Sequence, residues 1–306
     1  MRVVVVGLGV QGHKRKAVAG TEAVATVDPV HPEAKYKRIE DVTLASYDAA
    51  LLCIPDEPKI EILTYLLSNR KHALVEKPLF SPDSSSLVTL KALAEKNRVA
   101  CYTAYNHRFE PHFVRMKEVL DSGRLGKIYA IRMFYGNGTA RLVRDSAWRD
   151  QGAGVLPDLG SHLLDTLLFW LGRPIEGFRI FSANRFENRA FDHVAFGAPK
   201  ADPLIQLEIT LLSWRNHHYA DVLAEKGSAH ITSLCKWGPS TFIERTRKLP
   251  SGRPEEDVVT LEQPDPTWAI EYEHFKKLCE RGGNNIANDI WINDTLAALS
   301  REALAR

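Results

Sequence analysis

The sequence predicts an α/β fold, in which an N-terminal doubly wound parallel sheet precedes an α+β domain with a mostly antiparallel, open sheet. Three observations support this prediction. The first hundred residues alternate short apolar runs with amphipathic helical stretches, as parallel strands joined by crossover helices do. Between residues 178 and 244, strand-like segments follow one another without helical stretches. The length of 306 residues is about twice that of one domain, so we expect domains over residues 1–118 and 119–306.

The strands expected in the first domain are short apolar runs. Val3–Val6 is entirely β-branched, which favours a strand buried on both faces of a parallel sheet. The other expected strands are Ala23–Val27, Ala49–Ile54, Ala73–Val75 and Val99–Thr103. Apolar residues at helical spacing predict the intervening helices, which are Gln11–Ala19, Glu57–Asn69 and Pro82–Asn97. For the last helix we expect Ser81 as the N-cap and Pro82 as the first helical residue.

The pattern changes after residue 118. In Leu204–Leu212 apolar residues alternate with polar ones, which predicts a strand with one buried face. A strand is also expected at Lys127–Tyr135. The helices expected around and within this second part are His112–Ser122, Asp158–Leu171, Trp268–Glu280 and Ile286–Ala305. An antiparallel sheet in this region would be covered by few helices.

Composition excludes several classes of protein. Forty basic and 38 acidic residues leave a formal charge of +2, which does not indicate nucleic-acid binding. The four cysteines are far apart and form no CxxC pair, so we expect buried thiols in a reducing compartment. No apolar run approaches the ~20 residues that span a bilayer, and a basic cluster at residues 13–16 argues against a secretory signal. We therefore expect a cytoplasmic protein with no nucleic-acid or membrane partner.

The segment Gly7–Gly12 reads GxGxxG and lies between an expected strand and an expected helix. In a dinucleotide site the first glycine permits the tight turn, Gly9 lets the backbone approach a pyrophosphate, and Gly12 allows close helix packing. Asp28 ends the next strand, where a carboxylate can accept hydrogen bonds from ribose hydroxyls. The pattern predicts dinucleotide binding. The alternatives are a bare glycine-rich turn and, for Asp28, a residue that only caps its own turn.

Lys77 follows the strand Ala73–Val75 within the sequence Glu76-Lys77-Pro78. The carboxyl ends of strands in an open α/β sheet face the ligand crevice, and a following proline restrains Lys77 to an extended conformation. A functional lysine is one interpretation. A solvated loop with a salt-bridging lysine is the other.

Asp158 and His162 are four residues apart on an expected helix and would share one face. They follow the glycine-rich segment Gly152–Gly154. One hypothesis is a positioned acid/base pair, and the alternative is a packed structural histidine. The remaining histidines show no recognised zinc spacing, so we expect no metal.

Four segments in this order resemble the motifs of the Gfo/Idh/MocA oxidoreductase family. They are Gly7–Gly12, Glu76–Pro78, Tyr105–Pro111 and Trp148–Asp165. The resemblance covers essentially the whole chain. It implies a Rossmann domain followed by an α+β domain whose open sheet face often builds a dimer or tetramer. One departure is the segment Asp56–Lys59, where many members carry a histidine.

The resemblance also implies roles for individual residues. Lys77, Asp158 and His162 would form the catalytic group. The residues expected to bind the cofactor are Gly7, Leu8, Gly9, Val10, Gln11, Gly12, Asp28, Ile54, Pro55, Glu76, Lys77 and Asn106. Those expected near the substrate or the nicotinamide are Tyr135, Trp148, Arg149 and Tyr272.

The predicted function is an NAD(P)-dependent dehydrogenase or reductase acting on a secondary alcohol or ketone of a sugar, sugar nucleotide or cyclitol. The charge of Asp28 favours NAD, with NADP remaining possible. Because the family also includes NAD-dependent glycosidases and a non-catalytic regulator, both stay open as alternatives. The aromatic residues expected on the strands and left uncovered by helices predict a homodimer or homotetramer. They are Trp214, Tyr219, Trp237 and Phe242.

Overall fold

The computed structural model describes residues 1–146 and 149–306. The chain forms two compact units, and each is built from two separate segments. The first unit comprises Met1–Asn106 and Thr267–Asp294, and the second comprises His107–Pro266 and Thr295–Arg306. The boundary expected after residue 118 therefore differs from the one observed. It falls inside helix α4 (Pro111–Asp121), which packs against elements of the second unit.

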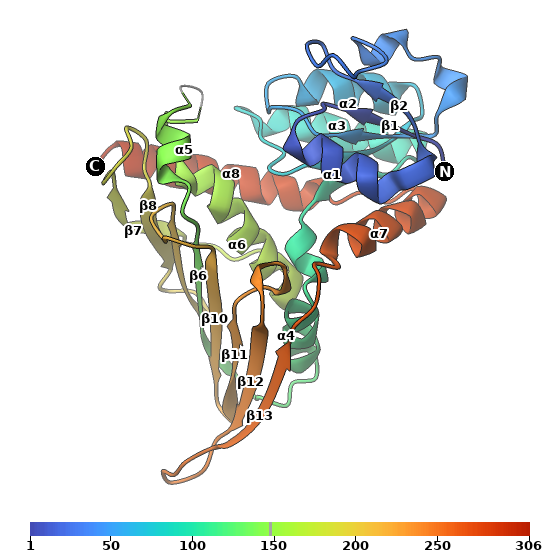
Figure 1. Ribbon diagram of the computed structural model, residues 1–306. Helices are drawn as coiled ribbons and strands as arrows, with labels where there is room; N and C mark the ends of the chain where they lie inside the picture. Colours follow the sequence, from blue (N-terminus) through green and yellow to red (C-terminus); the bar gives the residue numbers. More distant parts are fainter. Residues whose placement is uncertain (147–148) are drawn as a thin grey trace. The chain divides into compact units, whose positions relative to one another are not determined.

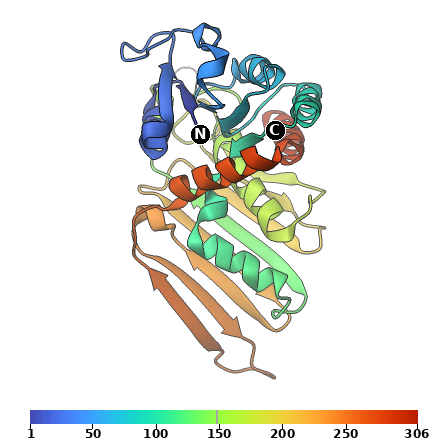
Figure 2. The ribbon, with the colours of Figure 1, turned by 90° about the vertical axis from the view of Figure 1, so that its right-hand side faces the viewer.

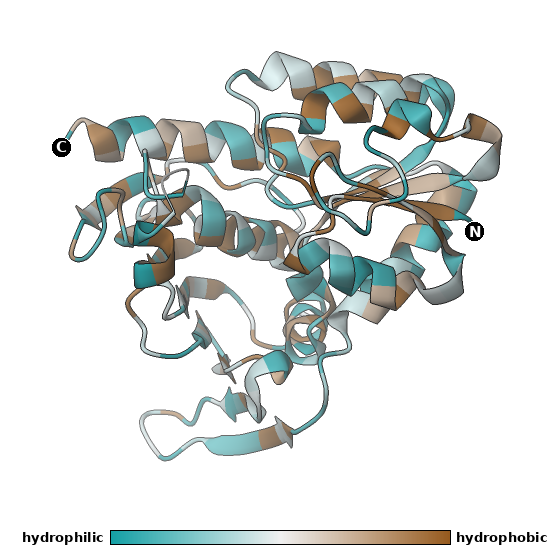
Figure 3. Cartoon of the chain, turned by 45° about the horizontal axis from the view of Figure 1, so that its top comes forward, coloured by the Kyte–Doolittle hydropathy of each residue, from teal (hydrophilic) through white to brown (hydrophobic). Residues whose placement is uncertain are grey.

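The first unit contains a parallel sheet of five strands in the order β2-β1-β3-β4-β5 (Figure 1). The strands are β1 (Val3–Val6), β2 (Ala23–Val27), β3 (Ala49–Leu52), β4 (His72–Glu76) and β5 (Cys101–Ala104). All residues of β1, β3 and β5 are buried, as the uninterrupted apolar runs predict. The strands beside the N-terminus are accordingly brown in Figure 3, and the helices around them alternate brown and teal. Strands β2 and β3 lie on opposite sides of β1, so the order in which strands are added changes sides between β1 and β3. Sheets of this kind bind ligands at such a point.

Five helices contribute to the first unit. They are α1 (Val10–Ala19), α2 (Lys59–Ser68), α3 (Ser84–Asn97), α7 (Thr267–Arg281) and the first part of α8 (Ile286–Leu304). Helix α7 returns to this unit by packing against α1. The expected cap of α3 is wrong by two residues. Asp83 is the N-cap and accepts a 2.9 Å hydrogen bond from the amide of Ser85, while the Ser81 hydroxyl donates to the carbonyl of Asp83.

The second unit contains an eight-stranded sheet in the order β13-β12-β11-β10-β6-β9-β8-β7. Among the described strands of this eight-stranded sheet, β6 and β9 form the only parallel pair, and the other neighbours are antiparallel. The strands are β6 (Ile128–Gly136), β7 (Arg179–Asn184), β8 (His193–Ala198), β9 (Leu204–Thr210), β10 (His217–Ala224), β11 (Gly227–Thr232), β12 (Ser240–Thr246) and β13 (Glu255–Leu261). This sheet confirms the predicted fold class. Strand β13 was not expected from the sequence, because it begins with three exposed acidic residues.

Helices α4 and α6 (Val155–Leu171) pack on one face of the eight-stranded sheet, as Figure 2 shows. A short helix, α5 (Ala140–Arg144), follows β6. On β9, the side chains of Ile205, Leu207 and Ile209 are buried, whereas Gln206 is exposed, so the predicted alternation is confirmed. None of the helices in the described part of the chain combines the length and the apolar character needed to span a membrane.

The four aromatic residues expected on an uncovered sheet face lie in different environments. Phe242 is fully buried and packs against His112, so its expected exposure is wrong. Trp237 lies beside Tyr135. Tyr219 is half-buried, and Trp214 is fully exposed.

Candidate functional site

The turn between β1 and α1 needs glycine at two positions for steric reasons. Gly7 has a φ of 89°, and a Cβ there would lie 2.3 Å from the carbonyl oxygen of Cys53. A Cβ on Gly12 would lie 1.8 Å from the carbonyl oxygen of Gly7. These contacts bring α1 close to the ends of β1 and β3. Gly7 and Gly12 are therefore required by the fold itself.

Gly9 differs from these two glycines because no atom lies within 4 Å of a Cβ placed on it. It is exposed, as are Val10 and Gln11. The first backbone hydrogen bond within the helix runs from the amide of His13 to the carbonyl of Gly9 at 3.0 Å. The preceding amides of α1 therefore have no acceptor within the helix. An open approach to free helix amides fits the pyrophosphate of a dinucleotide.

Asp28 follows β2 and accepts hydrogen bonds from three backbone amides. Its Oδ2 binds the amide of Leu8 at 2.8 Å, and its Oδ1 binds those of Val30 at 2.9 Å and His31 at 2.8 Å. Burial raises the pKa of Asp28, but these amides outweigh it and hold the pKa below its usual value. The carboxylate thus caps its turn, as the alternative interpretation held. Because a carboxylate has about four acceptor positions, it retains one for a ribose hydroxyl.

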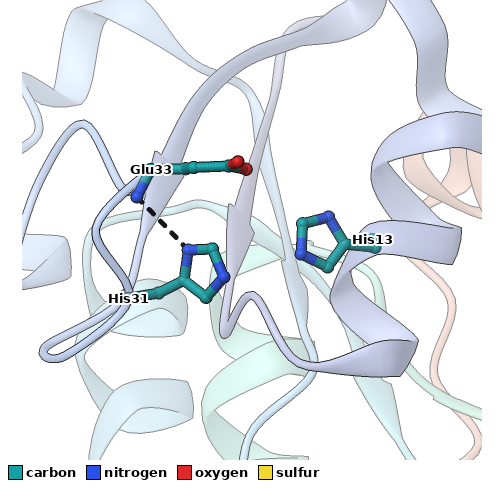
Figure 4. A group of neighbouring side chains, drawn as sticks. All are labelled: His13, His31 and Glu33. Carbon is teal, nitrogen blue, oxygen red and sulfur yellow. Dashed lines mark hydrogen bonds between the residues drawn. The ribbon is translucent and has the colours of Figure 1, made fainter.

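His13 and His31 lie close to this turn with Glu33 (Figure 4). The two rings are 5.4 Å apart, and the ligand atoms of all three side chains lie within 4.8 Å of one another. The amide of Glu33 donates to Nδ1 of His31 at 3.3 Å, which in a neutral ring places the proton on Nε2. Nδ1 of His31 therefore already acts as an acceptor within this group.

A second group with metal-ligand chemistry lies in the second unit and comprises Glu110, Cys235 and Asp265. Burial raises the pKa of the Cys235 thiol, and the nearby carboxylate of Glu110 raises it further.

Glu76 precedes Lys77 and forms an ion pair with Arg15 of α1 inside the first unit. Its Oε1 lies 2.7 Å from Nε of Arg15, and Nη2 of Arg15 lies 2.6 Å from Glu271 of α7. The ring of Trp268 lies 4.2 Å from the guanidinium carbon of Arg15. Arg15 is 1% exposed and Glu271 is fully buried. The carboxylate of Glu76, which we expected to bind cofactor, is thus held by this buried pair.

Lys59 contacts the same loop from α2. Its Nζ donates to the carbonyl oxygens of Glu76 and Pro78 and to the carboxylate of Asp56, at 2.7–2.8 Å. Burial lowers the pKa of Lys59, and the Asp56 carboxylate opposes that effect. No sequence motif marked Lys59 as part of a site. It belongs to the segment that departs from the family's pattern.

The other expected residues of the first unit lie as follows. Ile54 and Pro55 are partly exposed at the carboxyl end of β3, beside the glycine turn. Asn106 is buried, and its Nδ2 donates to Oγ1 of Thr267 at 2.9 Å. Tyr272 belongs to α7 of this unit and not to the expected second domain. It is 3% exposed, and its hydroxyl donates to Glu22 at 2.7 Å, so the structure gives it a packing role.

Helix α6 of the second unit carries Asp158 and His162. It begins after Gly154, which has a φ of 54° and whose Cβ would lie 2.2 Å from the carbonyl oxygen of Phe191. The amide of Val155 donates to that same carbonyl at 2.8 Å. The glycine-rich segment therefore lets the start of α6 approach the backbone closely. This contact fixes the first turn, in which Asp158 lies.

His162 is 6% exposed and belongs to a cluster of rings. His107 stacks on it with the ring centres 4.2 Å apart, and the ring of Tyr135 lies 5.7 Å away. Nζ of Lys236 lies 3.2 Å from Nε2 of His107. Burial raises the pKa of the Tyr135 hydroxyl, and the charges of Asp158 and Glu110 add to this. The structure thus brings together Asp158, His162 and Tyr135, as expected.

Two residues of this cluster were missed by sequence reasoning. His107 directly follows Asn106 in a motif that was noted, so its position was a usable signal. Lys236 had no signal, because its contact spans 129 residues of sequence. Arg149 is described and half-buried, whereas Trp148 lies outside the described residues.

Comparison with known proteins places this geometry in context. Residues 113–230 match the model of the GFO/IDH/MocA C-terminal domain. An uncharacterized oxidoreductase of Schizosaccharomyces pombe is 32% identical over 143 residues, which are 45% of this chain and 38% of that protein. Inositol 2-dehydrogenase 2 of Saccharopolyspora erythraea is 29% identical over 51% of this chain and 43% of its own length. The alignments thus span less than half of these relatives.

A solved structure shares the fold over the full chain. Levoglucosan dehydrogenase in complex with NADH superposes with a TM-score of 0.84 and covers 100% of this chain and 97% of its own. The sequence identity is 17%. This similarity establishes the two-part architecture described above.

Proposed function

We propose that this chain, whose residues 113–230 match the GFO/IDH/MocA C-terminal domain, is an NAD-dependent dehydrogenase or reductase of that family. Its substrate is a secondary alcohol or ketone of a sugar, sugar nucleotide or cyclitol. The observation that carries the proposal is the open turn at Gly9, which leads to free amides of α1 beside the carboxylate of Asp28. The same assignment is supported by a relative named inositol 2-dehydrogenase and by the solved structure of levoglucosan dehydrogenase with NADH, which has a similar fold.

The residues of the first unit suit the cofactor. The amides at the start of α1 would hold the pyrophosphate, and Asp28 would accept a hydrogen bond from the adenosine ribose. The bound nicotinamide dinucleotide supplies the hydride-accepting chemistry. Because a 2′-phosphate would meet the negative charge of Asp28, we propose that NAD is preferred to NADP.

The catalytic group that we propose comprises Lys77, Asp158 and His162. In the oxidation direction His162 takes the proton of the substrate hydroxyl, a role that suits an imidazole near neutral pH. Lys77 donates a hydrogen bond to the same oxygen and stabilises its developing negative charge. Asp158 orients the substrate hydroxyls or His162. Tyr135, Trp148 and Arg149 are proposed substrate contacts.

Two other functions would use the same first unit. An NAD-dependent glycosidase would bind cofactor tightly and show no net reduction of it. A dinucleotide-sensing regulator would need no catalytic group, whereas this chain carries Lys77, Asp158 and His162 in the family's order. We therefore favour the dehydrogenase.

The proposal includes a homodimer or homotetramer and a cytoplasmic location. Strands of the second unit carry Arg132, which is exposed, and Phe134 on one sheet face, which would suit a partner subunit. The four cysteines are free, which suits a reducing compartment.

The experiment that tests the function is a panel of inositols, sugars and UDP-sugars incubated with the purified chain and NAD. We expect at least one compound to produce NADH, measured by absorbance of the reduced nicotinamide. Hydrolysis of a glycoside without net NADH formation would replace the dehydrogenase by the glycosidase. Failure to bind NAD at millimolar concentration would contradict both.

A further inference from the structure

The ammonium group of Lys59 contacts the backbone on both sides of Lys77. Its Nζ donates to the carbonyl oxygen of Glu76 at 2.8 Å and to that of Pro78 at 2.7 Å. A third bond of 2.7 Å goes to the carboxylate of Asp56. An ammonium has three N–H donors, so these acceptors match its full donor set.

This arrangement is costly to build. Lys59 is 2% exposed, and a buried ammonium is tolerated only when it is paired and hydrogen-bonded. An apolar side chain would fill the same space without that cost. What a lysine provides here, and an apolar residue would not, is its hydrogen bonds to the carbonyl groups of Glu76 and Pro78, the two neighbours of Lys77. They restrain the backbone from which the side chain of Lys77 extends.

The same loop is restrained at a second point. The carboxylate of Glu76 binds Arg15 at 2.7 Å, and Arg15 is held in turn by Glu271 and Trp268. Glu76 is thus fixed at its carbonyl by Lys59 and at its carboxylate by Arg15. Lys77 lies directly after this fixed residue.

We propose that Lys59 is a positioning residue, which holds the carbonyl groups on either side of Lys77 and thereby sets where the Lys77 ammonium lies during the reaction. This inference rests on the proposed function, because it takes Lys77 to act on the substrate. It also gives a physical role to Asp56 and Lys59, which lie in the segment where this chain departs from the family's pattern.

The test is Lys59→Met, which removes all three donors and keeps the length of the side chain. A displacement of about 1 Å at a reacting group costs on the order of 100-fold in rate. We expect kcat to fall by about 10- to 100-fold, while the Kd for NAD stays within about threefold of wild type. Hydrogen–deuterium exchange of the amides in residues 76–80 should accelerate in the chain without substrate.

The matched control is Lys71→Met. Lys71 lies in the same unit, and its Nζ donates to the carbonyl of Tyr47 at 2.8 Å, away from the Lys77 loop. This variant should keep wild-type kcat and wild-type exchange in residues 76–80. Lys59→Arg, which retains N–H donors, should recover part of the lost kcat.

Two results would overturn the proposal. One is a Lys59→Met enzyme whose kcat falls no further than that of Lys71→Met, and the other is unchanged exchange in residues 76–80. If Lys59→Met does not fold, Lys59→Gln is compared with Lys71→Met in the same two measurements. Because glutamine keeps two N–H donors, we expect a smaller fall in kcat. The exchange measurement needs no turnover, so it separates failure of this positioning role from failure of the proposed reaction.

Discussion

Arg15 joins three parts of the first unit at one buried guanidinium. It pairs with Glu76 at the end of β4 and with Glu271 on α7, and its plane faces Trp268. The pKa of Arg15 is lowered by burial, but the two carboxylates more than compensate and raise it overall. The guanidinium of Arg15 therefore stays charged, and its two ion pairs link the end of β4 to α7.

Removing Arg15 should strongly destabilise the first unit. Arg15→Ala leaves Glu271 buried without its counter-charge, for which the expected loss is about 3–5 kcal/mol in the free energy of unfolding. Urea denaturation measures it. The control is Arg2→Ala, which removes an exposed ion pair with Asp48 and should change stability little. Equal losses in the free energy of unfolding for the two variants would show that the buried pair stabilises the protein no more than the exposed pair does.

We propose that a single residue, Asp28, also decides cofactor choice. Wild-type enzyme should have a higher kcat/KM with NAD than with NADP, because the ionised Asp28 repels a 2′-phosphate. Asp28→Ser should move the ratio of the two kcat/KM values towards NADP. Asp28→Asn, which removes the charge but keeps an acceptor oxygen for the Leu8 amide, should do the same with less loss of stability. A wild-type preference for NADP, or an unchanged ratio in both variants, would remove Asp28 from the cofactor site.

Among the elements, the turn between β1 and α1 contains one glycine that the fold requires, Gly12, and one that we propose approaches the cofactor, Gly9. A Cβ on Gly12 meets the backbone of Gly7, whereas a Cβ on Gly9 meets no atom within 4 Å. Both belong to the same motif, so sequence alone treats them alike.

The paired variants Gly12→Ala and Gly9→Ala should therefore fail in different ways. Gly12→Ala should lower the melting temperature, since helix α1 must move away from β1. Gly9→Ala should keep the wild-type melting temperature and weaken NAD binding by about tenfold or more, because the new methyl group occupies the approach of the pyrophosphate. Calorimetric titration with NAD and thermal unfolding distinguish the two. A Gly9→Ala protein that binds NAD normally would place the pyrophosphate elsewhere.

Sequence periodicity predicted most of the helices and strands, since burial on one or both faces imposes a pattern that survives without an alignment. It failed where the deciding contact is remote or polar. The N-cap of α3 is Asp83 and not the expected Ser81, because the carboxylate of Asp83 accepts a hydrogen bond from the amide of Ser85. Strand β13 was missed because it pairs with β12 while carrying exposed acidic residues.

The residues of the candidate site also fall into those that the sequence predicts and those that it does not. Motif residues such as Gly9 and His162 were predictable because their spacing is local. The contacts of Lys59 are with carbonyl groups 17 and 19 positions away, and Arg15 meets Glu271 across 256 positions. No local pattern encodes such pairs, and none marks the return of α7 to the first unit.

At the scale of the whole molecule, the sheet face opposite α4 and α6 predicts self-association. It presents Arg132, which is exposed, and the stacked rings of Phe134 and Tyr219, whose centres are 5.3 Å apart. An exposed aromatic sheet face of this kind commonly packs against a second subunit.

Light scattering at micromolar concentration should accordingly give the mass of a homodimer or homotetramer. Tyr219→Asp places a charge within that face and should shift the population towards monomer. Val88→Asp is the control, because Val88 is 54% exposed on α3 of the first unit and should leave the mass unchanged. A monomeric wild-type chain would contradict the assembly but not the chemistry.

We propose that Lys77 and His162 act on one substrate oxygen in an NAD-dependent oxidation. The most direct test of this proposal is the turnover of Lys77→Ala and His162→Ala, measured with the substrate identified from the panel. Each should lower kcat by roughly 10²–10⁴-fold while NAD binding stays largely intact, because the proposed role of each residue is at the transition state. Near wild-type turnover in either variant would contradict the role assigned to that residue.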